Sequence, residues 1–148
     1  MTPGPWTEVH YQQMSWHDNH VHALRIIEGE HGSGDLVLDL DYILEWLKAD
    51  EGFQFRMVPV TLRFRCVTNL RIELDYSRAS AALGPFSIHA IERRGEVRER
   101  YTAQCWTINI NWPPGEISFE ADGYEQEAWG KVVVSAEQRL QPQQRANA

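Results

Sequence analysis

Apolar residues recur at every second position in one segment of the chain after another. In the clearest segments, 58–66 and 70–76, these positions are Val58, Val60, Leu62, Phe64 and Cys66, then Leu70, Ile72, Leu74 and Tyr76. A strand that buries one face has this period of two, because successive side chains point to opposite faces of a sheet. The pattern therefore predicts a mainly β protein.

The two clearest segments are predicted to form a hairpin with a short turn at 68–69. Pairing Cys66 with Leu70 keeps the two apolar faces together. The same register sets Arg63 opposite Glu73 on the solvent side, where opposite charges favour pairing. A slip of one residue would mix the two faces, so this register is specified by the sequence.

Six further segments have strand-like patterns and are separated by turns that contain glycine or proline: 20–27, 35–43, 86–94, 101–110, 116–124 and 131–136. Short connections of this kind favour antiparallel neighbours over the crossovers of a parallel sheet. The segment 42–49 fits either a short helix or a continuation of the preceding strand. The predicted fold is a single antiparallel β-sandwich or other β-sheet-rich domain of about eight strands, with at most one short helix.

The chain has 148 residues, the usual size of one domain. Residues 1–15 are expected to be an irregular lead-in, because Pro3, Gly4 and Pro5 interrupt helix and strand alike. Residues 141–148 contain no large apolar side chain and are expected to be a flexible tail. The predicted domain is therefore 16–140.

The balance of charge is acidic. There are 14 Lys and Arg against 21 Asp and Glu, which gives a formal net charge of -7. Such a chain repels phosphate backbones and anionic lipid, so we expect neither nucleic-acid nor membrane binding and favour a basic protein partner. The opening residues lack the pattern of a secretion signal, and no apolar run is long enough for a membrane helix, so a cytoplasmic location is expected.

One polar cluster could hold a metal ion. His20 and His22 are expected on one face of a strand, and Asp39 and Asp41 on one face of the next. If His22 lies opposite Asp41, two imidazoles and two carboxylates come together, a donor set that suits a divalent metal ion. A register shifted by one residue would separate them, and the four would then decorate a solvent face. A metal-binding protein or metal-dependent enzyme is thus the alternative function.

No other segment suggests catalysis. The serines lie in no strand-turn-helix context typical of a nucleophile elbow, and neither Cys66 nor Cys105 has a neighbouring base. The glycines of 29–34 precede a strand and lack the Lys and Ser or Thr of a phosphate-binding loop. We therefore assign no catalytic residue and no cofactor, and favour a protein that is not an enzyme.

Trp112, Trp129, Glu120 and Asp122 are the candidate partner-binding residues. Both tryptophans lie beside turns, where an exposed ring can anchor a partner. The two acids belong to the stretch 116–127, which holds five acidic residues and no basic one and could attract a basic protein. In the alternative interpretation the tryptophans cover the core and the acids solvate an outer strand face.

Three pieces of the chain resemble segments of small uncharacterised bacterial proteins, some akin to the immunity proteins of polymorphic toxin systems. They are Ser-Trp-His-Asp-Asn-His-Val-His, Leu-Val-Leu-Asp-Leu-Asp-Tyr-Ile and Gly-Glu-Ile-Ser-Phe-Glu-Ala-Asp-Gly-Tyr-Glu-Gln. The resemblance implies a bacterial, β-rich, non-catalytic domain and assigns no activity to any residue. The function predicted first is a non-catalytic protein-binding or immunity-like module of the bacterial cytoplasm.

Overall fold

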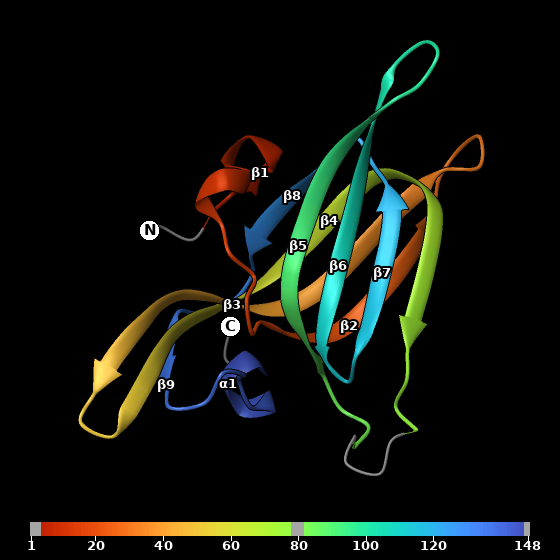
Figure 1. The fold of residues 1–148 in the computed structure, drawn as a ribbon. Helices are drawn as coiled ribbons and strands as arrows, with labels where there is room; N and C mark the ends of the chain where they lie inside the picture. Colours follow the sequence, from red (N-terminus) through yellow and green to blue (C-terminus); the bar gives the residue numbers. More distant parts are fainter. Residues whose placement is uncertain (1–3, 78–81, 147–148) are drawn as a thin grey trace.

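The computed structural model describes residues 4–77 and 82–146, and it confirms the predicted fold class (Figure 1). Nine strands form a single antiparallel sheet: β1 (Trp6–Thr7), β2 (His20–Glu28), β3 (Gly34–Ala49), β4 (Gly52–Leu74), β5 (Phe86–Val97), β6 (Thr102–Trp112), β7 (Gly115–Glu120), β8 (Gly123–Ala128) and β9 (Val133–Ser135). A 3-10 helix, η1 (Glu8–Gln13), and one short helix, α1 (Pro142–Ala146), lie near the two ends. No helix in the described ranges is long and apolar enough to cross a membrane.

The sheet closes on itself around a packed interior. The strand order is β1-β8-β4-β3-β2-β5-β6-β7, and β7 pairs back onto β4. Residues 60–65 of β4 pair with β8, and residues 68–74 pair with β7. β4 also pairs with β3 on its other side. This one long strand therefore closes the ring of strands β4-β3-β2-β5-β6-β7.

The predicted hairpin at 68–69 is wrong, because β4 runs without a turn from Gly52 to Leu74. Cys66 and Asn69 have φ angles of 57° and 53°, and the pairing shifts register beside each of them. Such bulges bend a strand and increase its twist without reversing it. The bend moves β4 from β8 to β7 as its partner. Arg63 consequently pairs with Asp35, at 3.3 Å, and not with Glu73.

The segment 42–49 is strand, so the short helix considered for it is wrong. It pairs with 52–58 of β4, with Trp46 opposite Phe55 and Lys48 opposite Phe53. Residues 43–57 therefore form a hairpin, here called the arm, which extends away from the closed part of the sheet (Figure 1). β9 pairs with the arm at 55–57 of β4.

The interior of the closed part is aromatic. Phe64 is central, since its ring centre lies 4.7 Å from that of Phe119, 5.2 Å from that of Trp106 and 5.6 Å from that of Tyr124. All four side chains are buried. A second, smaller cluster at the base of the arm consists of Ile43, Phe55, Met57 and Leu140.

Both ends of the described chain pack against the sheet. At the N-terminal end Trp6 is buried, and the Tyr11 hydroxyl donates to the backbone oxygen of Ile91 at 2.6 Å. Near the C-terminal end Leu140 is buried, and so is Arg145, which lies within the segment 141–148. The reason is that Leu140 joins the smaller apolar cluster and Arg145 finds carboxylate partners on β3.

Candidate functional site

The predicted contact between His22 and Asp41 is present, but it arises from a different register. Asp41 lies opposite His20, Asp39 lies opposite Ala23, and the register shifts between Val21 and Ala23, which leaves His22 in a bulge. The bulge turns the imidazole toward β3, so that its Nε2 lies 2.7 Å from Oδ2 of Asp41. A bulge commonly re-aims a side chain in this way.

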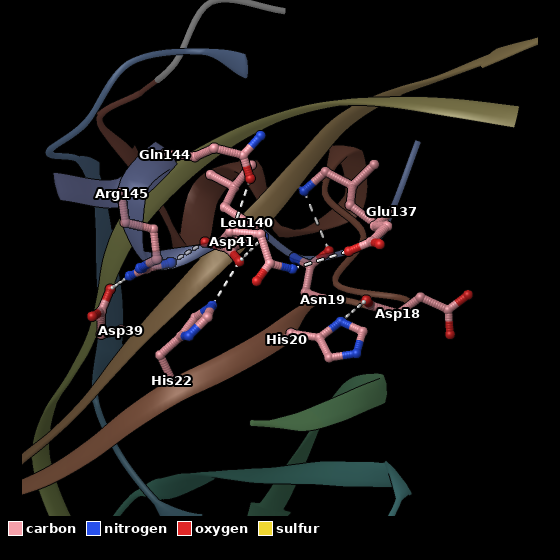
Figure 2. A network of polar contacts seen from close by, with 12 residues as sticks. Asp18, Asn19, His20, His22, Asp39, Asp41, Glu137, Leu140, Gln144 and Arg145 are labelled. Carbon is pink, nitrogen blue, oxygen red and sulfur yellow. Dashed lines mark hydrogen bonds and ion pairs between the residues drawn. The ribbon is translucent and has the colours of Figure 1, made fainter. Parts of the chain in front are cut away.

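Asp41 is the centre of a buried polar network (Figure 2). Its side chain is 0% exposed, yet both carboxylate oxygens have partners. The backbone N–H of Leu140 donates to Oδ2 at 2.8 Å, and the Arg145 guanidinium donates to Oδ1. A buried carboxylate is tolerated when it is paired and fully hydrogen-bonded. Asp41 therefore connects strand β3 to the C-terminal segment at two points, Leu140 and Arg145.

Asp39 and Trp129 complete the network around Arg145. The guanidinium lies between Asp39 and Asp41 and forms an ion pair with each (Figure 2). Trp129 donates from Nε1 to Oδ1 of Asp39 at 3.1 Å, and its ring centre lies 5.1 Å from the guanidinium carbon. A cation over an aromatic face is attracted by the ring quadrupole. We call these residues the Asp41 network: His22, Asp39, Asp41, Trp129, Leu140 and Arg145.

The four residues predicted to bind a metal do not converge on one point. Arg145, a cation, lies between the two carboxylates, and His20 contacts the backbone oxygen of Asp18 at 3.1 Å. Burial lowers the pKa of His20 below its ordinary value of 6.5. In the part of the chain that the structure describes, no group of three or more His, Cys, Asp or Glu side chains is arranged to hold a metal ion.

Both acids of the predicted partner site have partners within the protein. Glu120 is only 18% exposed and accepts from Arg98 at 3.0 Å and from Asn69 at 2.6 Å. A hydrogen bond to Asp122 raises the pKa of the Cys66 thiol, so Asp122 also has an internal partner. These partners, Arg98, Asn69 and Cys66, come from other parts of the chain, so the 116–127 segment alone could not reveal them.

The two candidate tryptophans differ from each other. Both are 43% exposed. Trp129 belongs to the Asp41 network, because it donates to Asp39 and its ring packs against the Arg145 guanidinium. Its contacts are therefore made within the protein. Trp112 ends β6, opposite Ser87, and remains available to a partner.

A second exposed aromatic surface was not predicted from the sequence. Trp46 and Phe53 on the arm are 43% and 52% exposed, and the centre of the Trp46 ring lies 5.8 Å from that of Phe53 and 4.9 Å from that of Phe55. Together with residues 136–139 they line a groove of about 680 Å³, here called the aromatic groove. The available signal was the aromatic pair at 53 and 55, across a short turn from Trp46.

The arm also has a free strand edge. β3 pairs with β2 only as far as Asp41, whereas it pairs with β4 as far as Ala49. Within the described residues, 44–49 of β3 therefore have a strand partner on one side alone. Such an edge presents unpaired backbone N–H and C=O groups to another chain.

Comparison of the chain with models of known protein families found no match, and comparison with curated proteins found no significant similarity. The basis for a function is therefore the geometry of two features, the Asp41 network and the arm. The first is occupied by internal contacts. The second is exposed on both its backbone edge and its aromatic face.

Proposed function

We propose that the protein is a non-catalytic protein-binding module whose arm pairs with an extended segment of a basic partner protein. The observation that carries the proposal is the free edge of β3 at 44–49 beside the exposed rings of Trp46 and Phe53. An extended segment can add to such an edge through main-chain hydrogen bonds, and adjacent pockets then select its side chains.

The aromatic groove supplies the selectivity that an edge lacks. Trp46 and Phe55 face each other across the hairpin, as do Lys48 and Phe53, so all four side chains lie on the same face of the arm. A large apolar side chain of the partner fits between the rings and residues 136–139. Partly exposed tryptophans in such positions are typical of the residues that dominate interface energies.

Charge favours a basic segment as the occupant. Two acids, Glu51 and Glu137, and one cation, Arg139, line the aromatic groove, and neither acid takes part in an ion pair with another described residue. The chain as a whole has a net charge of -7, which attracts a cationic protein at long range. The resemblance to immunity proteins would make this partner a toxin domain and place the complex in the bacterial cytoplasm.

Site-specific crosslinking tests the proposal. A photoreactive phenylalanine analogue is placed at Lys48 on the arm or at Ile26, which is exposed on β2 and serves as the control. In cells that produce the protein, we expect one protein to crosslink at position 48 and not at 26. Equal crosslinking at both positions, or none at 48, would contradict the proposal.

The partner captured in this way is then purified and its affinity measured. The double variant Trp46→Ala/Phe53→Ala is expected to lower the affinity by about 100-fold, because both rings leave the interface. Trp112→Ala is the matched control, since Trp112 is as exposed as Trp46. We expect its affinity to stay within about twofold of the unmodified protein. A larger loss for Trp112→Ala than for the double variant would place the interface at the end of β6.

A further inference from the structure

A cavity of about 400 Å³ lies between β2, the 84–85 turn and the C-terminal segment. Its walls include three apolar side chains, Pro85, Leu140 and Pro142. Its polar lining includes His22, Arg139 and Arg145, and no acidic side chain of the described chain lines it. Cavities of this volume and composition commonly take small molecules.

Arg139 is the unusual member of this lining. It is half-buried, yet it forms no hydrogen bond or ion pair with any residue in 4–77 or 82–146. Its Nη1 lies next to Gly84, 3.7 Å from the position that a β-carbon on that residue would take. A partly desolvated guanidinium with no counter-charge is unfavourable, so an anion that reaches it is stabilised.

The other two polar groups differ from Arg139. Arg145 forms ion pairs with Asp39 and Asp41, whereas Arg139 has no ion pair within the described residues, so Arg139 is the guanidinium of this lining that can meet an anion. His22 uses Nε2 for Asp41, and no other described residue occupies its Nδ1. Burial lowers the pKa of His20, and the nearby Arg139 charge acts in the same direction.

We propose that this cavity binds a small organic acid, with its carboxylate on Arg139 and its apolar body against Pro85, Leu140 and Pro142. A guanidinium matches a carboxylate through two parallel N–H···O bonds, which favours this anion over a spherical one. The volume accommodates an acid with one ring or a short branched chain. The two sites share Arg139, which also lines the aromatic groove, but this proposal does not depend on the protein-binding role.

Titration of the isotope-labelled full chain with phenylacetate, followed by NMR, tests the proposal. We expect saturable shifts of the Leu140 and Gln141 backbone amides, because both residues line the cavity. Phenylacetamide has the same shape without the charge and should give no saturable shift. Inorganic phosphate has charge without an apolar body and should bind at least about tenfold more weakly than phenylacetate.

Variants at Arg139 assign the binding to this side chain. Arg139→Gln should lower the affinity for phenylacetate at least about tenfold. Arg139→Lys keeps the charge but cannot donate two parallel N–H···O bonds, so it should retain part of the affinity. Arg25→Gln is the matched control, since it removes the same charge at an exposed position on β2. The proposal is overturned if phenylacetamide binds as well as phenylacetate, if phosphate binds as tightly, or if Arg139→Gln and Arg25→Gln behave alike. If Arg139→Gln does not fold, the Arg139→Lys variant and the three probes decide.

Discussion

The closed part of the sheet and the arm are stabilised in different ways. In the closed part, most strands pair with a neighbour on each side over at least part of their length, and they enclose the rings of Phe64, Trp106, Phe119 and Tyr124. The arm has one free edge, and its base rests on a small apolar cluster and on the Asp41 network. Apolar packing therefore determines the overall fold, while a few polar contacts determine the position of the surface available for binding. Local opening of the arm should therefore require less free energy than global unfolding.

The largest expected effect is in the closed part. Phe64→Ala removes a ring that contacts three others, and should lower the free energy of unfolding by about 4 kcal/mol. Phe53→Ala on the arm is the matched control, because 52% of Phe53 is already exposed, and should cost less than about 1 kcal/mol. Urea unfolding of both variants measures the difference. Similar losses would mean that the arm is packed as tightly as the interior.

The next effect concerns the Asp41 network. Arg145→Ala leaves the buried Asp41 carboxylate without its cation and should lower the free energy of unfolding by about 3 kcal/mol. Asp41→Asn removes that buried charge, so the double variant should lose less than the sum of the two single losses. A double-mutant cycle measured by urea unfolding gives the coupling energy. Strict additivity would show that the two side chains do not interact.

Trp129 should contribute less. Trp129→Phe keeps a ring over Arg145 but removes the Nε1 donor to Asp39, and should lower the free energy of unfolding by about 1 kcal/mol. Trp112→Phe is the control, because Trp112 has the same exposure and does not belong to the Asp41 network, and it should change the free energy of unfolding by less than about 0.5 kcal/mol. Thermal unfolding of the pair checks the ranking. The reverse order would remove Trp129 from the Asp41 network.

The smallest expected effect is a pH dependence from His20. Because burial lowers the pKa of His20 below 6.5, the unfolded chain binds the proton more readily than the folded one. The stability contributed by the neutral imidazole is therefore present above pH 6.5 and is lost as the pH falls below that value. His20→Gln should reduce the loss in melting temperature between pH 7 and pH 5, whereas His31→Gln, at a fully solvated position, should not. An unchanged loss in His20→Gln would contradict this assignment.

The alternation of apolar residues was sufficient to predict strands but not their connections. A hairpin at 68–69 and a bulged continuous strand have the same alternation, because a bulge restores the apolar face after each extra residue. Asn69 is a residue type that tolerates the left-handed conformation, so it gave a weak signal. Cys66 gave none, and its conformation is imposed by the pairing of β4 with its neighbours.

The candidate site was predicted in part. The contact between His22 and Asp41 follows from their positions on adjacent strands, although the observed register differs from the predicted one. The role of Arg145 could not be predicted, because it lies 104 residues from Asp41 in a segment with a disordered composition. The free edge of β3 could not be predicted either, because it depends on where the pairing of β2 with β3 stops relative to the arm.

Hydrogen exchange of the β3 amides tests directly whether residues 44–49 form a free strand edge that a partner covers. In the isolated protein, the amides of 44–49 that point away from β4 should exchange at least about 100-fold faster than those of 36–41, which have strands on both sides. Addition of the captured partner should slow exchange at 44–49 and leave 36–41 unchanged. Equal protection of the two segments in the isolated protein would show that the edge at 44–49 is already covered. It would contradict the proposal that this edge binds a partner.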